Sequence, residues 1–168
     1  MLSALALAAA LALQPPTQGP AASPGFATVP ATAAEAEVGR VLDRLHATAA
    51  SADEAVYFDL FTPDARFIGT DATERWTMEE FRAFAEPYFQ RDTAWTYESR
   101  DRVIDIAPSG DVAWFDERLD NASYGETRGS GVLVRTDDGW KIAQYVLSFA
   151  VPNAVADDVV ARIRQGEP

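Results

Sequence analysis

The chain has 168 residues and a formal net charge of −12, with 26 acidic residues against 14 basic ones. This acid excess excludes nucleic acid and anionic lipid as natural partners, because both bind basic surfaces. The sequence has no cysteine and one histidine, His46. Disulfides, cysteine nucleophiles and metal sites built from thiolates or several histidines are therefore excluded within one chain. No glycine-rich phosphate-binding motif is present, and we expect neither a cofactor nor a metal.

The N-terminal part of the chain lacks the pattern of a folded domain. It begins with the apolar stretch MLSALALAAALALQ, which is too short to cross a bilayer and resembles the core of a secretory signal. We predict a signal peptide over residues 1–22 and a flexible linker, rich in Pro and Ala, over residues 23–33. The protein is then exported, to the periplasm or outside the cell. Because no Lys or Arg precedes the apolar run, the alternative is an Ala-rich tail on a cytoplasmic protein.

Two helices are predicted at the start of the domain, which we place at residues 34–152. Val38, Leu42 and Leu45 recur at helical spacing and form one apolar face. Asp53 can cap a second helix. Pro63 stops that helix, because the residue before a proline disfavours helical geometry.

A short strand, ARFIG, and the loop TDATERW lead to a third predicted helix. The helix begins at Thr77, with Glu80 at the spacing of a capping box. Pro87 is expected to kink or end it. The preceding loop can overhang the edge of a sheet, so we expect Asp71 and Trp76 to form the polar and aromatic lip of a cavity.

The rest of the domain alternates apolar and polar residues in four runs. The runs are AWTYESRDRVIDI, DVAWFDERLDN, YGETRGSGVLVRT and WKIAQYVLSFA. They predict long antiparallel strands joined by hairpins. The fold class is therefore α+β: a curved antiparallel meander sheet wraps around three N-terminal helices and forms a cone with a pocket for a small apolar molecule. Residues 153–168 predict a C-terminal helix or tail.

One carboxylate falls on the apolar face of the second long strand, and it belongs to Glu117. A two-residue loop at Ala122 and Ser123 would set Glu117 opposite Arg128 inside the cone. The pair can be a structural ion pair, a ligand-binding site or a catalytic centre with Glu117 as general base and Arg128 as its charge partner. Asp71 is the alternative base.

The last hairpin is predicted to turn through three residues, with Gly139 in the left-handed conformation. This register sets Val134 beside Ile142, and it brings Gln144 and Ser148 into the cavity as neutral hydrogen-bonding groups.

The first long strand does not keep its apolar residues on one parity. Its aromatic residues Trp95 and Tyr97 have the opposite parity to Ile104, and a β-bulge near Arg100 would bring all of them to one face.

Four further residues are candidates for binding a ligand: His46, Tyr57, Trp76 and Tyr97. His46 lies beside the apolar stripe of the first helix, where a hydrogen-bonded histidine at the edge of the core is the plainer interpretation. Aromatic residues at these spacings are also consistent with ordinary core packing.

From Glu37 to about Asn153 the chain resembles the SnoaL-like branch of the nuclear-transport-factor-2-like superfamily. The resemblance is carried by the helical start from VLDRLHATAAS onward, by EEFRAFAEPYF, and by GSGVLVRTDDGWKIAQYVLSF with its Gly-Trp-Lys-Ile ending. It implies the curved-sheet cone and, in many members, a homodimer through the sheet.

The activity implied by this resemblance is broad. Similar folds serve polyketide cyclases, ketosteroid isomerase, scytalone dehydratase, limonene epoxide hydrolase and proteins that only bind or associate, so the fold does not choose among them. A lone His46 departs from the two-histidine arrangement of the dehydratase. The expectation is a cofactor-free cyclase, isomerase or dehydratase acting on an apolar carbonyl or hydroxyl compound. The alternative is a secreted, non-catalytic binding or dimerisation module.

Overall fold

The computed structural model describes residues 32–166, and the predicted signal peptide and the linker up to residue 31 lie outside this range. The helices are α1 (Ala33–Ala50), α2 (Glu54–Asp59), α3 (Met78–Phe89), the 3-10 helix η1 (Asn153–Val155) and α4 (Ala156–Gly166). The strands are β1 (Phe61–Ile68), β2 (Arg75–Thr77), β3 (Glu98–Ile106), β4 (Val112–Asn121), β5 (Gly125–Thr136) and β6 (Gly139–Phe149). Among these residues, no helix combines the length and apolar character needed to span a membrane.

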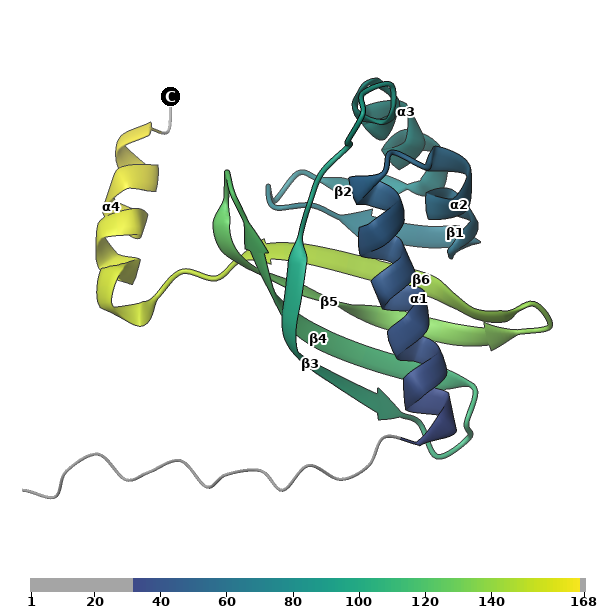
Figure 1. The fold of residues 1–168 in the computed structure, drawn as a ribbon. Helices are drawn as coiled ribbons and strands as arrows, with labels where there is room; N and C mark the ends of the chain where they lie inside the picture. Colours follow the sequence, from purple (N-terminus) through teal and green to yellow (C-terminus); the bar gives the residue numbers. More distant parts are fainter. Residues whose placement is uncertain (1–31, 167–168) are drawn as a thin grey trace, which may run out of the picture. The chain divides into compact units, whose positions relative to one another are not determined.

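The predicted α+β fold is confirmed: three helices near the start of the domain accompany a six-stranded, open, curved sheet of order β2-β1-β6-β5-β4-β3 (Figure 1). Strands β3 to β6 form the expected antiparallel meander. Two features were not expected. Strand β1 pairs with β6 in the parallel direction. Arg75–Thr77, predicted as the end of a loop and the start of a helix, forms β2 against β1.

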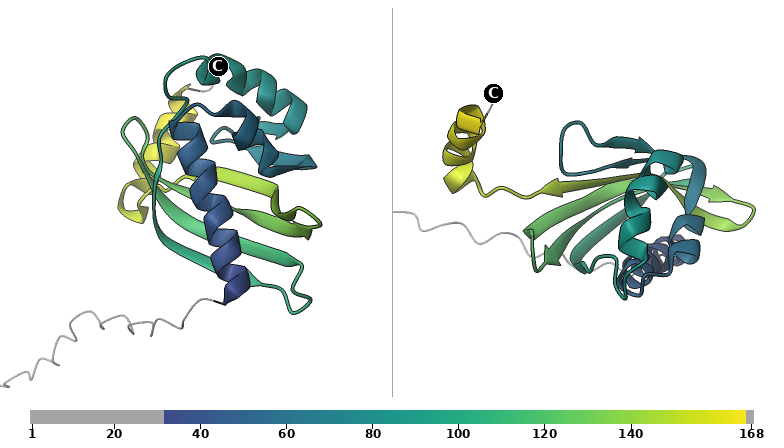
Figure 2. Two further views of the ribbon diagram at one scale, coloured as in Figure 1. Left: turned by 45° about the vertical axis from the view of Figure 1, so that its right-hand side comes forward. Right: turned by 90° about the horizontal axis from the view of Figure 1, so that it is seen from above.

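Helices α1, α2 and α3 lie on the same side of the curved sheet (Figure 2). Helix α1 buries Val38, Leu42 and Leu45 and packs against β3 and β6. Both α1 and α3 begin with a capping box, the second formed by Thr77 and Glu80 as predicted. Helix α3 ends at Phe89, just after Pro87.

Aromatic rings join these helices to the sheet. Phe81 of α3 stacks on Phe67 of β1, with ring centroids 3.8 Å apart and planes 14° apart. Phe67 in turn stacks on Tyr145 of β6. Tyr57 of α2 packs against Trp95 edge to face. Such pairs contribute beyond their buried area, so the end of the sheet that carries α2 and α3 has a largely aromatic interior.

The predicted bulge in the first long strand is confirmed. The register of β3 against β4 shifts between Arg100 and Val103, and Asp101 takes a left-handed φ of 51°. A bulge adds one unpaired residue and reverses the parity of the strand beyond it. Consequently Arg102 and Ile104 face the helices, on the same side as Tyr97.

The register predicted for β4 and β5 is wrong by one residue. Glu117 pairs with Gly129 rather than Arg128, because Asn121 pairs with Gly125 and leaves a three-residue loop instead of two. The side chain of Asn121 causes the longer turn, since its oxygen accepts hydrogen bonds from the backbone of Ser123 and Tyr124.

The last hairpin is partly as predicted. Gly139 has a positive φ of 100°, and Gln144 pairs with Val132 as expected. However, the predicted three-residue turn is wrong: Thr136 pairs with Gly139, which leaves a turn of two residues, and Val134 pairs with Lys141 rather than Ile142. Leu133 pairs with Ile142, so Ala143 is an extra residue that forms a bulge. Past this bulge the parity of β6 is reversed, and Tyr145, not Gln144, is buried under the helices.

A glycine makes the bulged pairing possible. A Cβ atom at Gly131 would lie 2.1 Å from the carbonyl oxygen of Gln144 on the neighbouring strand. Backbone cannot yield as a flexible side chain does, so the strands would separate. We expect Gly131→Ala to lower the free energy of unfolding by about 1–3 kcal/mol in urea denaturation, in line with overpacking of a core. An unchanged midpoint would show that β5 and β6 adjust freely at the bulge.

The other face of the sheet leaves apolar side chains in contact with solvent. Trp114 of β4 is 46% exposed and Val103 of β3 is 54% exposed. This is the face through which the family resemblance implies a homodimer, and the dimer remains a prediction. Helix α4 has no buried residue.

Candidate functional site

A cavity of about 920 Å³ opens between the helices and one end of the sheet. Aromatic side chains form much of its wall. The rings and apolar side chains that line it are Leu45, Tyr57, Phe67, Trp76, Phe81, Phe84, Tyr88, Ala94, Trp95, Tyr97, Ala122, Tyr124, Tyr145 and Leu147. Charged side chains also line it: Glu74, Arg91, Glu98, Asp120 and Glu126. His46 also lines it, from α1. A volume of this size holds a small organic molecule, and its walls favour an apolar one.

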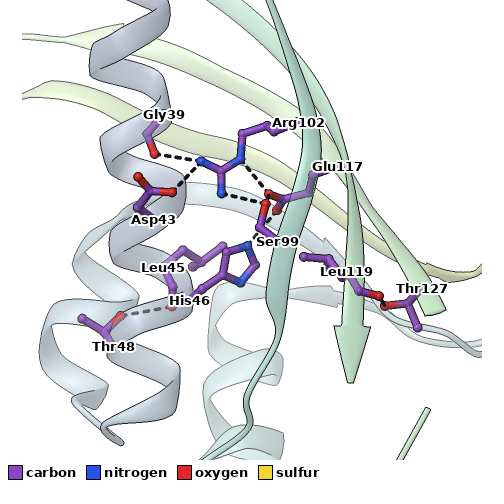
Figure 3. Close-up of polar contacts among 10 residues, drawn as sticks. All are labelled: Gly39, Asp43, Leu45, His46, Thr48, Ser99, Arg102, Glu117, Leu119 and Thr127. Carbon is purple, nitrogen blue, oxygen red and sulfur yellow. Dashed lines mark hydrogen bonds and ion pairs between the residues drawn. The ribbon is translucent and has the colours of Figure 1, made fainter. Parts of the chain in front are cut away.

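Behind His46 lies a buried charged network centred on Glu117, whose side chain is 0% exposed (Figure 3). The Nε2 atom of His46 lies 2.7 Å from Oε1 of Glu117. The second carboxylate oxygen, Oε2, accepts hydrogen bonds from Nε of Arg102 at 2.7 Å and from the hydroxyl of Ser99. Three donors from α1 and β3 therefore meet at one carboxylate of β4.

Arg102 connects this carboxylate to the surface. Its Nη1 donates to the carbonyl oxygen of Gly39 at 3.1 Å and to the carboxylate of Asp43 at 2.7 Å. Asp43 is largely exposed, whereas the Arg102 side chain is 14% exposed. The β3 bulge is what turns Arg102 toward α1, so an irregularity of one strand positions the cation beside Glu117.

The network keeps Glu117 ionised. Burial alone raises the pKa of a carboxyl group, but hydrogen bonds from His46 and Ser99 and the charge of Arg102 together hold the pKa of Glu117 below its ordinary value. An ionised carboxylate can only accept hydrogen bonds. Nε2 of His46 must therefore carry the proton that the two groups share.

This assignment decides what His46 can do in the cavity. With a proton on Nε2, the neutral ring has a lone pair on Nδ1, and no described residue donates a hydrogen bond to that atom. A histidine oriented by a carboxylate, with its other nitrogen free, has the arrangement of a general acid or base.

The expected ligand-binding residues divide into two groups. His46, Tyr57, Trp76 and Tyr97 all line the cavity. Gln144 and Ser148 do not, because the Ala143 bulge turns them to the opposite face of β6.

Two of the three expected catalytic residues are also displaced. Arg128 is exposed on the outer face, opposite Arg118, so its predicted pairing with Glu117 is wrong. Asp71 is exposed in the loop between β1 and β2, and Thr73 engages its carboxylate through two hydrogen bonds, which lower its pKa. Asp71 does not line the cavity, whose lip is instead formed by Trp76 and Glu74.

Three residues of the site were not identified from the sequence: Ser99, Arg102 and Tyr145. The bulge predicted near Arg100 implied that Arg102 shares a face with Tyr97, so the signal for Arg102 was present. Tyr145 depended on a bulge in β6 that was not predicted.

No cluster of three or more His, Asp or Glu side chains within residues 32–166 could hold a metal ion. The three donors around Glu117 occupy both of its oxygens. The cavity therefore presents to a ligand His46, the tyrosine hydroxyls and the charged side chains of Glu74, Arg91, Glu98, Asp120 and Glu126.

The comparisons with known structures support the same architecture. An NTF2-like protein of unknown function from Pseudomonas putida KT2440 superposes with a TM-score of 0.59 at 17% identity, covering 70% of this chain and 87% of that one. A candidate dehydratase of the NTF2-like family from Streptomyces avermitilis has a TM-score of 0.61 at 14% identity, covering 71% and 97%. A DUF3225-family protein of unknown function from Pectobacterium atrosepticum has a TM-score of 0.58 at 24% identity, covering 70% and 91%. At these identities the likeness shows the fold alone.

No curated protein matches this sequence. The model of the SnoaL-like domain matches residues 38–152, from the buried face of α1 to just beyond β6. That range contains the whole cavity lining and the Glu117 network. The chain therefore belongs to the SnoaL-like domain family, within the NTF2-like fold.

Proposed function

We propose that this protein is a cofactor-independent enzyme that moves a proton on an apolar carbonyl compound, in a reaction of the isomerase, cyclase or dehydratase type. The observation that carries the proposal is His46: it lines an aromatic cavity, and a fully buried Glu117 holds its Nε2 at 2.7 Å. The base is thus His46 rather than Glu117, whose two oxygens are already occupied.

The roles follow from the positions of the charges. As Nδ1 takes a proton from the substrate, the ring becomes an imidazolium, and the ionised Glu117 beside it stabilises that charge. Ser99 and Arg102 keep the carboxylate in place and ionised. The aromatic part of the wall gives an apolar ring system a surface to pack against. One structural neighbour is described as a candidate dehydratase, which is compatible with this chemistry.

The experiment uses 1-tetralone, an apolar bicyclic ketone with exchangeable hydrogens beside its carbonyl. The purified protein is mixed with 1-tetralone in D₂O, and deuterium at the α-carbon is followed by NMR. Exchange above the buffer rate supports a base in the cavity. Quenching of tryptophan fluorescence measures binding separately, since Trp76 and Trp95 line the cavity.

The second candidate is a non-catalytic module that binds an apolar molecule. The observation in its favour is that Glu117 accepts hydrogen bonds from three donors, as a purely structural ion pair also does. Saturable binding of 1-tetralone with exchange at the buffer rate would favour this candidate and reject proton transfer.

A further inference from the structure

Helix α4, at the C-terminal end of the described chain, has no buried residue. It has 11 residues, and an isolated helix shorter than about 12–15 residues is only marginally stable in water. Its apolar residues Ala156, Val159, Val160 and Ile163 recur at spacings of three and four, so they lie on one face. Ile163 is 58% exposed. Such a helix gains stability when its apolar face packs on another surface.

The chain reaches α4 from the rim of the cavity. The matched SnoaL-like domain ends at residue 152, so α4 is an addition to that domain. At the end of β6 the backbone N–H of Ala150 donates to the carbonyl oxygen of Glu126 at 3.5 Å, and Glu126 lines the cavity. Residues 150–155 join β6 to α4. Six extended residues span at most about 20 Å, so α4 is tethered close to the cavity opening.

Exposed aromatic rings border this opening. Phe149 pairs with the buried Thr127, which places Phe149 on the helix-facing side of the sheet, and it is half-exposed. Its ring packs edge to face on the half-exposed Tyr124, with centroids 5.3 Å apart. Phe84 of α3 is also exposed, and both Tyr124 and Phe84 line the cavity. The rim therefore offers an apolar surface on the sheet side and on the α3 side.

The charges of the two surfaces are complementary. Four carboxylates and one arginine line the cavity. In α4, Arg162 and Arg164 flank Ile163, and no ion pair of the described residues includes either arginine. When Ile163 packs on the rim, both guanidinium groups lie beside an acidic surface, where opposite charges attract.

We propose that α4 is a lid: its apolar face packs on Phe84, Tyr124 and Phe149 and closes the cavity over a bound molecule. The lid opens by turning about residues 150–155. A closed lid must open before the ligand leaves, so it slows release. This inference goes beyond the proposed function and does not depend on proton transfer, because a lid acts in the same way on a protein that only binds.

The first test locates α4 by disulfide formation. The sequence has no cysteine, so an introduced pair meets no other thiol within the chain. Phe84→Cys with Ile163→Cys is expected to form an intramolecular disulfide on oxidation, because the closed lid brings these positions together. In the control pair, Val103→Cys with Ile163→Cys, the first position is exposed on the outer face of the sheet and should not cross-link. Non-reducing electrophoresis and peptide mass spectrometry identify the products.

Each other product of this oxidation overturns the lid. An equal or larger yield of disulfide in the control pair would place α4 on the outer face of the sheet. A covalent dimer in place of the intramolecular product would place α4 on a second copy of the chain. Absence of any disulfide in the Phe84 pair would show that α4 does not reach the rim.

The second test measures the release of bound 1-tetralone by stopped-flow tryptophan fluorescence. Ile163→Asp places a charge on the apolar face and should raise the dissociation rate constant by about 10-fold, in line with the loss of one partly buried apolar side chain. Ala161→Asp adds the same charge on the opposite face of α4 and should leave the rate constant unchanged. Circular dichroism confirms that each variant is folded.

The outcomes separate this inference from the proposed function. Equal dissociation rate constants for Ile163→Asp and the wild type would overturn the lid, whatever the rate of α-hydrogen exchange. Exchange at the buffer rate would reject proton transfer and leave both tests of the lid in force. If 1-tetralone does not bind, the proposed function fails, and the cross-link, which needs no ligand, decides on the lid.

Discussion

Replacing Glu117 with alanine is expected to lower the free energy of unfolding by about 3–5 kcal/mol. The carboxylate is fully buried, and its removal leaves the guanidinium of Arg102, 14% exposed, without its inner partner. Arg102 then keeps only the exposed Asp43 as a counter-ion. A largely buried charge that loses its inner partner is destabilising because water does not replace that partner. Urea denaturation followed by tryptophan fluorescence measures the change.

A surface carboxylate on the same sheet is the matched control. Glu126 of β5 accepts hydrogen bonds from Arg100 and Arg118, but all three side chains are well exposed. Glu126→Ala should cause a much smaller loss, because water solvates the arginines that remain. Equal losses of unfolding free energy in the two variants would show that the burial of Glu117 does not increase its contribution to stability. The double variant Glu117→Leu, Arg102→Met should recover part of the stability that Glu117→Ala loses, since no unpaired buried charge is left.

The stability of the Glu117 network should also depend on pH. Because the folded state holds the pKa of Glu117 below its ordinary value, the ionised carboxylate stabilises the fold above the pKa of the unfolded chain. That contribution is lost as the pH falls through the folded-state pKa. The difference in stability between wild type and Glu117→Gln should therefore be largest near neutral pH and should shrink below about pH 4.5. A difference that stays constant down to pH 3 would contradict this account.

Changing His46 to glutamine is expected to slow α-hydrogen exchange of 1-tetralone by about 10²–10⁴-fold, the usual contribution of a general base. Glutamine retains an N–H that can reach Glu117, so the network and the fold should survive. Unlike imidazole, the amide of glutamine has no nitrogen lone pair that accepts a proton at neutral pH. Deuterium incorporation gives the rate, and fluorescence quenching should give an almost unchanged affinity.

Asp71→Asn provides the control for His46. Asp71 was the alternative base from the sequence, but its side chain is exposed and does not line the cavity. Asparagine keeps the acceptor oxygen that Thr73 uses. Exchange should continue at the wild-type rate. A large loss of exchange rate in Asp71→Asn, together with the wild-type rate in His46→Gln, would show that Asp71 is the base and would reject His46 in that role.

The two bulges differ in whether they were predicted from the sequence, and both decide which residues face the cavity. The bulge in β3 was predicted because aromatic and aliphatic residues change parity along one strand, and it is what brings Arg102 beside Glu117. The bulge in β6 was not predicted, although apolar residues change parity there too, from Trp140 and Ile142 to Tyr145 and Leu147. It exchanged Gln144 for Tyr145 on the inner face.

The pairing of Glu117 depended on a single turn. Burial of Glu117 followed from its place among apolar alternate residues, and the structure agrees. Its partner did not follow, because one additional residue in the loop after Asn121 shifts every cross-strand pair and turns Arg128 outward. Local side-chain hydrogen bonds of Asn121 decide that loop length, and their effect extends along both strands.

The sequence by itself determined the elements and their faces: the capped helices, the strand order of the meander, the inward position of Glu117 and the family. Those features arise from local periodicity and capping, which act over a few residues. Only the tertiary structure decided that His46 meets Glu117, 71 residues away, and that Tyr57 and Tyr145 line one cavity. Such meetings depend on how α1 and α2 pack across a bulged, curved sheet, and a one-residue change in register is enough to alter them.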